Sequence, residues 1–151
     1  MSLRNGIVIV DHGSRRAESN QMLEQVAALF GERFKDRYAI VEPAHMEIAE
    51  PSIATAYGKC VERGAQRVVV CPFFLGPGKH WTQDIPRLTA EAAEKYPGTL
   101  FHVTPTLGID DLILDLLEKR VNSCDAHDYL CDTCKGTNRA GTVEQKSKLS
   151  R

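Results

Sequence analysis

The sequence predicts an α/β protein built on a parallel four-stranded sheet that is flanked by helices. Two observations support this prediction. Short runs of branched apolar residues alternate along the chain with amphipathic segments, which is the pattern of βαβ units. The run "QRVVVCPFFL" is also too apolar for a sheet with one face in water. We therefore expect helices on both faces of the sheet.

The first half of the chain predicts two strands and two helices. Residues 6–12 form an apolar strand, and residues 39–47 form the next. Between them, residues 17–35 are predicted to be helical, because apolar side chains recur on one face. These side chains are Met22, Leu23, Val26, Ala27 and Phe30. Pro51 favours the start of a second helix and Gly64 its end.

The second half predicts two more strands and two more helices. Residues 66–75 form the third strand, which ends in the turn "GPG". Residues 82–96 follow as a helix, and Pro86 is expected to distort or delay its start. Residues 99–104 form the fourth strand. Residues 110–121 form an amphipathic helix with acidic residues in its first turn.

Composition indicates one globular domain. The chain has 151 residues, of which 42% are hydrophobic and 26% charged. A net charge of −1 gives no reason to expect binding to nucleic acid or to an anionic membrane. No apolar run approaches the roughly 20 residues that span a bilayer. We expect an α/β domain over residues 1–122 and a polar, partly disordered tail over residues 123–151.

Polar side chains follow three successive predicted strands. His12 ends the first strand, His45 and Glu47 end the second, and His80 follows the third across its turn. In an open parallel sheet, ligands bind beyond the carboxyl ends of the strands. Imidazole nitrogen and carboxylate oxygen suit divalent ions such as Fe²⁺, Co²⁺, Ni²⁺ or Zn²⁺. The sequence therefore predicts a metal-handling cleft at this edge.

Each of these residues, taken alone, also has a purely structural interpretation. His12 could bond to a loop carbonyl, and Glu47 could accept backbone amides of its own loop. His80 could form a surface packing pair with Trp81, and a hydrogen-bonded structural role is favoured for His45. Their convergence at one edge favours the metal cleft over this combination of separate roles.

The motif after the first strand, "DHGSRR", excludes some classes of protein. It lacks the glycines of a dinucleotide fingerprint and the GK[ST] of a P-loop. Ser14 near a histidine suggests a hydrolase only weakly, because the chain has no GxSxG elbow. Asp11 and Ser14 could instead cap the helix that follows.

The five cysteines fall into two groups. Cys60 and Cys71 are predicted to be buried thiols of the core. Cys124, Cys131 and Cys134 gather in the tail, the last two as a CxxC pair. An odd count with a CxxC indicates a reducing compartment and a metal or cluster site in the tail, rather than a secreted disulfide framework.

Four segments carry a resemblance to a known family: "IVIVDHGSRRAESN", "VEPAHMEIAEPSI", "RVVVCPFFLGPGKHWTQDIP" and "CDTCKGTN". In their order and spacing they resemble the class II tetrapyrrole chelatases (the CbiX/SirB-like family), specifically the short, plant-type sirohydrochlorin ferrochelatases. The resemblance spans about residues 6–136. It implies a flavodoxin-like chelatase fold and an enzyme, a lyase, that inserts Fe²⁺ into sirohydrochlorin in the last step of siroheme biosynthesis.

The resemblance also implies roles for individual residues. His12 and His80 would bind the incoming metal and accept protons from the pyrrole nitrogens, and Glu47 would be their acidic partner. The chemistry suits these residue types, because a neutral imidazole near pH 7 can bind metal or take a proton. The candidates for contacts with the substrate carboxylates are Ser14, Arg15 and Lys79.

The resemblance implies partners and a compartment as well. One half-sized chain would enclose the large planar substrate poorly, so we expect a homodimer with the cleft between subunits. The location would be the chloroplast stroma if a transit peptide has been removed, and the cytoplasm otherwise. The chain as given leads directly into its first strand, so we expect no targeting peptide within it.

Plant-type members carry a [2Fe–2S] cluster on C-terminal cysteines, and Cys124, Cys131 and Cys134 match these. A cluster normally has four protein ligands, and the tail supplies three. The fourth could come from the other subunit or from a group other than cysteine. A zinc site or free thiols are the alternatives.

Three other functions remain open at the level of sequence. The chain could insert Co²⁺ or Ni²⁺ into the same ring, because the ligand set accepts several divalent ions. It could be a carrier that binds metal or tetrapyrrole without catalysis. It could also be an electron-transfer or redox-sensing protein that works through its tail.

Overall fold

The computed structural model describes residues 2–129 and residue 139. The chain forms two compact units, Met1–Ile109 and Asp110–Arg151. The first unit contains the sheet, and the second contains one described helix. The division expected after residue 122 stays a prediction.

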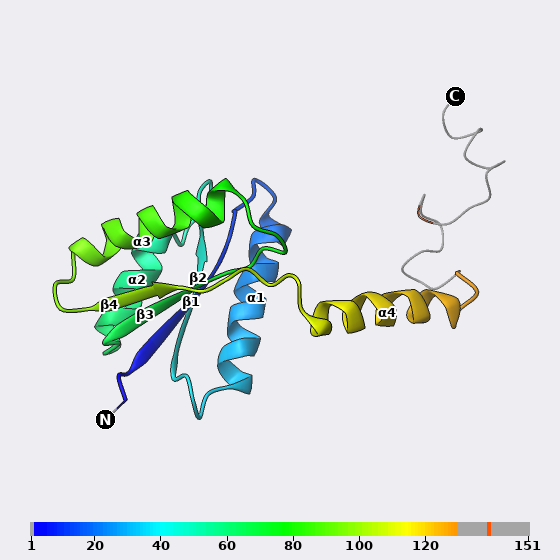
Figure 1. Ribbon diagram of the computed structural model, residues 1–151, viewed down its shortest axis with the longest axis horizontal. Coiled ribbons are helices and arrows are strands. Elements are labelled where there is room, and N and C mark those ends of the chain that lie inside the picture. Colours follow the sequence, from blue (N-terminus) through cyan, green and yellow to red (C-terminus); the bar gives the residue numbers. More distant parts are fainter. Residues whose placement is uncertain (1, 130–138, 140–151) are drawn as a thin grey trace. The chain divides into compact units, whose positions relative to one another are not determined.

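The first unit alternates strands and helices in the predicted order (Figure 1). Its elements are β1 (Asn5–Asp11), α1 (Ala17–Arg33), β2 (Ile40–His45), α2 (Ile53–Glu62), β3 (Arg67–Pro72), the π-helical turn η1 (His80–Asp84), α3 (Ile85–Glu94) and β4 (Leu100–Val103). β1 is shifted by one residue toward the N-terminus relative to its predicted range, and the other three strands are one to three residues shorter at each end than predicted. The polar loops that follow β1 and β2 therefore begin close to the site residues.

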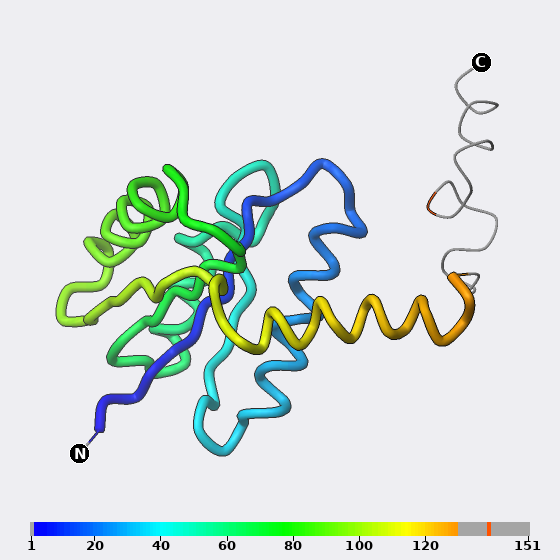
Figure 2. Tube along the Cα trace, turned by 45° about the vertical axis from the view of Figure 1, so that its right-hand side comes forward, coloured from blue at the N-terminus to red at the C-terminus, as the bar shows by residue number. Residues whose placement is uncertain are grey.

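The four strands form one parallel sheet in the order β2-β1-β3-β4, which confirms the predicted α/β class. In the register of the sheet, Val8 lies opposite Glu42 on β2 and Val70 on β3. Because β1 lies between β2 and β3, the carboxyl ends of these three strands are neighbours. The trace in Figure 2 shows the chain leaving the sheet at this edge after each strand.

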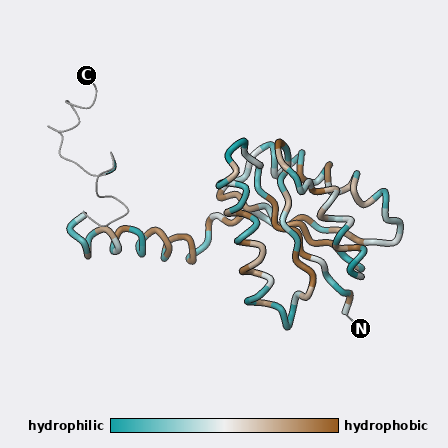
Figure 3. Tube along the Cα trace, turned by 180° about the vertical axis from the view of Figure 1, so that it is seen from behind, coloured by the Kyte–Doolittle hydropathy of each residue, from teal (hydrophilic) through white to brown (hydrophobic). Residues whose placement is uncertain are grey.

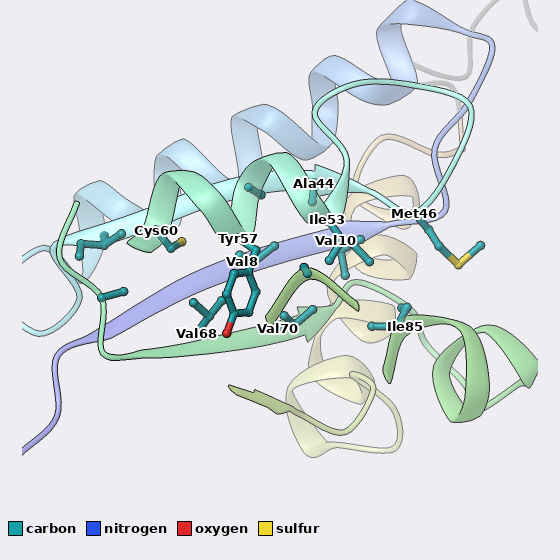
Figure 4. Packing of buried hydrophobic residues seen from close by; sticks show 14 residues of the cluster. Val8, Val10, Ala44, Met46, Ile53, Tyr57, Cys60, Val68, Val70 and Ile85 are labelled. Atoms are coloured by element: carbon teal, nitrogen blue, oxygen red, sulfur yellow. The ribbon is translucent and has the colours of Figure 1, made fainter. Parts of the chain in front are cut away.

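The unbroken apolar run of β1 is explained by helices on both faces of the sheet. Val8 and Val10 face α2 and α3, where they pack with Tyr57 and other buried side chains (Figure 4). Ile7 and Ile9 face the opposite way, against α1. The hydropathy colouring in Figure 3 shows the apolar strands between more polar helices. Each fully buried aliphatic side chain contributes about 1.5–3 kcal/mol relative to an exposed one.

The helix after β3 starts irregularly, as Pro86 predicts, and two residues earlier than expected. The first turn, η1, has π-helical geometry, in which the backbone N–H of Ile85 donates to the carbonyl of His80. Pro86 has no N–H, so it cannot donate the α-helical hydrogen bond to the turn before it. The widened turn places His80 at the start of the helical segment.

The second unit contains α4 (Asp111–Asp125), which extends four residues beyond the predicted end. The side chain of Asp110 caps it by accepting a hydrogen bond of 2.9 Å from the backbone N–H of Leu112. In the described part of the chain, no helix has both the length and the apolar character needed to cross a membrane. Cys124 lies in α4, whereas Cys131, Cys134 and most of the tail predicted to be partly disordered lie outside the described residues.

Candidate metal-handling site

The loop after β1 turns sharply at Gly13, whose φ is +90°. This backbone conformation favours glycine. The N–H of Gly13 donates a 3.0 Å hydrogen bond to Oδ1 of Asp11, which stabilises the turn. A Cβ on Gly13 would overlap the carbonyl oxygen of Glu47. Glycine is therefore required here, and its absence of a side chain lets the first loop lie directly on the second.

Ser14 is held by its neighbours rather than presented freely. Its backbone N–H donates to Oδ1 of Asn20 at 2.9 Å, and its carbonyl accepts from Nδ2 of Asn20 at 2.8 Å. The Ser14 hydroxyl accepts a 3.0 Å bond from the backbone N–H of Arg16. The suggestion that Ser14 caps α1 is wrong, because the N-cap residue is Arg16 and no side chain caps this helix; the Ser14 hydroxyl bonds to the turn just before it. Asn20, which the sequence reasoning missed, clamps the loop from the first turns of α1.

The loop after β2 continues the pairing of the two strands beyond their ends. The backbone N–H groups of Met46 and Glu47 donate to the carbonyls of Asp11 and His12, at 2.8 and 3.1 Å. This pairing brings the side chains of His12 and Glu47 together, with 3.1 Å between His12 Nε2 and Glu47 Oε1. The two side chains are 41% and 54% exposed, so both are accessible to a ligand.

The third contribution comes from η1. The rings of His12 and His80 meet edge to face, with centroids 4.8 Å apart. Nδ1 of His80 lies 2.8 Å from Oδ2 of Asp84, one helical turn later. This contact leaves Nε2 of His80 as the nitrogen for a ligand. The role of Asp84 was missed in the sequence, although the four-residue spacing in "HWTQD" is the signal of such a pair.

His45 lies beneath these loops and is fully buried. Its Nδ1 is 2.6 Å from Oδ1 of Asp11, so it is the hydrogen-bonded structural histidine that the sequence favours. It alternates with Glu47 along the chain. Of His45 and Glu47, only Glu47 is exposed at the edge of the sheet.

A small hollow of about 170 Å³ lies beside His80. Phe74 and Trp81 form its aromatic walls, and Gly76 and Gly78 complete it. The indole N–H of Trp81 donates a 3.0 Å bond to the carbonyl of Thr104, which fixes the ring. A larger hollow of about 480 Å³ lies along α1 and β2 but is lined by none of the three converging residues. Of the three converging residues, only His80 lines the smaller hollow.

The predicted contacts with substrate carboxylates are less well defined. Arg15 and Lys79 are exposed on the loops that carry the two histidines. Within residues 2–129, no hydrogen bond or ion pair joins either cation to His12, Glu47 or His80. Their roles, like that of Ser14, stay predictions.

The described cysteines are all free thiols. Cys60 is buried as predicted, whereas Cys71 is only partly buried. Burial raises the pKa of the Cys71 thiol, and a hydrogen bond with Thr104 opposes that rise. Cys71 packs against the apolar cluster of Ile7 and Ile9, on the α1 face of the sheet.

The arrangement suits an ion that is held briefly. In the part of the chain that the structure describes, no three His, Cys, Asp or Glu side chains already surround a common metal position. The side chains of His12, Glu47 and His80 are 41%, 54% and 48% exposed. Nitrogen and oxygen ligands of this kind exchange readily with divalent first-row ions.

Most of the chain is similar to a family of known proteins. The family model CbiX matches residues 6–124. An Arabidopsis thaliana protein named sirohydrochlorin ferrochelatase, chloroplastic, is 52% identical over 139 residues, which cover 89% of this chain and 61% of that protein. A Methanocaldococcus jannaschii sirohydrochlorin cobaltochelatase is 45% identical over 84 residues, 54% of this chain and 56% of that protein.

A solved structure shares the fold. The structure of SirB from Bacillus subtilis with Fe³⁺ matches with a TM-score of 0.68 and 30% identity, over 80% of this chain and 47% of that one. The chain thus spans between about half and three fifths of the length of these three relatives.

Proposed function

The chain belongs to the CbiX family, and from this membership and the geometry of the sheet edge we propose that it is a sirohydrochlorin ferrochelatase. It would insert Fe²⁺ into sirohydrochlorin to form siroheme. The proposal is supported by the name of the Arabidopsis relative and by the iron in the SirB structure. Iron is here a substrate and the tetrapyrrole is the second substrate.

One observation carries the proposal: three successive strand ends deliver two imidazoles and a carboxylate to one place. His12 Nε2 lies 3.1 Å from Glu47 Oε1, and the ring of His80 lies beside that of His12. The packing pair of His80 with Trp81 does not account for this, because His80 contacts His12 and Asp84.

The residues fit the balance of the reaction. The ring loses two N–H protons while it gains one divalent ion, so the site must accept protons and release metal. We assign metal delivery and proton acceptance to His12 and His80, which have exposed imidazoles. Glu47 offsets the charge of the ion while it is bound. The aromatic walls at Phe74 and Trp81 would lie against the flat ring.

The decisive experiment is anaerobic mixing of the protein with sirohydrochlorin and Fe²⁺, followed by the absorption of the ring. We expect conversion by the wild type and loss of conversion in His12→Ala and His80→Ala. His102→Ala is the matched control, because His102 is an exposed histidine on β4 that is not part of the site. Binding of the ring without conversion by the wild type would replace the chelatase with a carrier.

A second candidate is insertion of Co²⁺ or Ni²⁺. The nitrogen and oxygen ligand set accepts these ions as well as Fe²⁺, and the archaeal relative is named a cobaltochelatase. Comparison of kcat/KM for the three ions under anaerobic conditions separates the candidates. We expect Fe²⁺ to give the highest value.

We also propose that the working form is a homodimer. A hollow of about 170 Å³ is smaller than the roughly 300–1,000 Å³ of typical ligand pockets. The side chains of His12 and His80 are also 41% and 48% exposed, so the single chain does not enclose them. The SirB chain is about twice as long as the matched region, which would supply the other half of such a cleft. Sedimentation at micromolar concentration should show dimers, and a monomer active in insertion would contradict the proposal.

The [2Fe–2S] cluster and the compartment remain proposals. The tail cysteines have the thiolate chemistry of cluster ligands, but three thiolates do not complete the usual set of four. A fourth ligand from a second copy or another group is required, and zinc or free thiols are the alternatives. No step of metal insertion is assigned to the tail. For the compartment we propose the chloroplast stroma, which is supported by the name of the Arabidopsis relative.

A further inference from the structure

We propose that His45 is a positioning residue for the loop that carries His12. The inference rests on the proposed function only for its kinetic readout. Through its Nδ1–H, His45 holds the carboxylate of Asp11, and this carboxylate holds the backbone N–H of Gly13. The buried histidine thereby determines where the exposed histidine lies.

The contacts form a continuous chain. His45 Nδ1 lies 2.6 Å from Asp11 Oδ1, and the same oxygen accepts the 3.0 Å hydrogen bond from Gly13. Asp11 and His45 are also paired across β1 and β2. His12 lies in the chain between Asp11 and Gly13. A bond that orients Asp11 therefore constrains the backbone on both sides of His12.

Packing alone does not explain a histidine at this position. Its two neighbours in the chain, Ala44 and Met46, are apolar and buried. His45 itself is fully buried, and its Nε2 has no hydrogen-bond partner among the described residues. The nearest carboxylate recorded for that nitrogen is Glu24, at 3.9 Å. A buried polar atom without a partner is unfavourable, so the single bond to Asp11 is the interaction that an apolar side chain could not supply.

The bond to Asp11 is of a strong kind. The carboxylate accepts from Gly13 N–H and from an imidazole N–H, and hydrogen bonds to a charged acceptor are stronger than neutral ones. The Asp11 side chain is only 20% exposed, so water replaces a missing donor poorly. Without His45 the carboxylate is expected to rotate toward solvent and release Gly13.

Loss of the hydrogen bond between Gly13 and Asp11 would displace the residues of the proposed metal site. The turn is packed closely, because a Cβ on Gly13 would lie 3.3 Å from Cβ of His45. The carbonyl of His12 accepts from Glu47 N–H at 3.1 Å. A shift of the turn therefore changes the contacts of His12 with both Glu47 and His80.

The test compares two substitutions of His45. His45→Phe keeps a ring of similar size and removes the donor. His45→Asn places a side-chain N–H close to the position of Nδ1. We expect His45→Phe to lower kcat by about 10- to 100-fold, as for other groups that orient a metal ligand, with the KM for sirohydrochlorin unchanged. His45→Asn should recover most of the lost kcat.

A second readout is independent of catalysis. The amide proton of Gly13 is hydrogen-bonded to a carboxylate, so its NMR shift should move upfield in His45→Phe and return in His45→Asn. The Gly98 amide serves as the reference, because Gly98 has a similar φ of +91° and lies on a different loop. This readout tests the positioning role even if the wild type inserts no metal.

Thr89→Val is the control for a buried hydrogen bond. The Thr89 hydroxyl donates a 2.8 Å bond to the carbonyl of Ile85 and lies outside the chain of contacts. Thr89→Val should have a lower Tm than the wild type and an unchanged kcat. The proposal is overturned if His45→Phe keeps the wild-type kcat and the wild-type NMR shift of the Gly13 amide proton. It is also overturned if His45→Asn restores neither the kcat nor this shift. If His45→Phe does not fold, Asp11→Ala, which removes the shared acceptor, must show the same loss of kcat, and a wild-type value there overturns the proposal.

Discussion

Each of the two exposed histidines is paired with a carboxylate through a different ring nitrogen. Glu47 faces Nε2 of His12, whereas Asp84 faces Nδ1 of His80. A carboxylate on Nδ1 orients the ring and makes the remaining nitrogen a better ligand. The two histidines are therefore not equivalent: the carboxylate contacts Nδ1 in His80 and Nε2 in His12.

We expect Asp84→Asn to weaken Co²⁺ binding and Fe²⁺ insertion by about 10- to 100-fold, because His80 would lose its orienting carboxylate. Isothermal titration with Co²⁺ and the anaerobic insertion assay measure the two effects. Glu91→Gln is the matched control. It removes one negative charge from α3, where Glu91 pairs with Arg87 at 2.8 Å, and should change neither value.

Gly13→Ala tests the close contact between the two loops. A methyl group there would overlap the Glu47 carbonyl at a backbone conformation that already disfavours alanine. We expect a loss of several kcal/mol in the free energy of unfolding, measured by denaturant titration, together with loss of insertion.

Gly98→Ala separates the cost of the backbone conformation from the cost of overlap with a neighbouring atom. Gly98 has a φ of +91°, but a Cβ there would meet no atom within 4 Å. The expected loss is only about 1 kcal/mol, with insertion unchanged. Equal losses in the two variants would contradict the overlap.

The sequence predicted that His12, Glu47 and His80 converge, because strand ends in a parallel sheet share an edge, and the structure brings these side chains together. It could not predict which supporting residues hold them. Asn20 reaches back to Ser14 across six residues of loop and helix, and this clamp depends on the turn at Gly13. The His45 bond with Asp11 depends on a strand register that the sequence does not reveal.

Among the elements, the strands and α1 followed from hydrophobic periodicity, whereas the start of the segment after β3 did not. Periodicity indicated a start at residue 82, yet the segment begins at His80 as a π-helical turn. Backbone hydrogen bonds decide this geometry, and they are not encoded in an apolar pattern. The strand order β2-β1-β3-β4 likewise depends on packing between distant segments.

The thiol of Cys60 makes the stability of α2 against the sheet depend on pH. Burial, with a smaller contribution from the charge of Glu42, raises the pKa of Cys60 from 9.0 to about 12, while Arg63 opposes the rise. Above pH 9 the unfolded chain therefore binds fewer protons than the folded one. The free energy of unfolding should fall by up to about 1.4 kcal/mol per pH unit through this window.

Denaturant titrations at pH 8 and pH 10.5 measure this dependence. Cys60→Ala should remove the part due to the thiol, so its free energy of unfolding should decline less between the two pH values. The same decline in both proteins would show that other groups are responsible.

At the scale of the whole molecule, the residues proposed for insertion and the tail cysteines belong to different compact units. His12, Glu47 and His80 all lie in the first unit. We therefore expect a variant with Cys124, Cys131 and Cys134 all changed to serine to keep the wild-type insertion rate. Any bound iron, sulfide or zinc that the wild type carries should be lost from it. A large fall in insertion would connect the tail to catalysis.

The contact between Gly13 and the Glu47 carbonyl has a consequence for attempts to alter metal preference. The loops after β1 and β2 are packed against each other and joined by backbone hydrogen bonds, so a change in the length of either loop would displace both. The loop after β3 is different, because Cβ atoms added at Gly76 or Gly78 would meet nothing within 4 Å. A mutant library should therefore vary the first two loops jointly and the third independently, and most of the selectable diversity should come from the third.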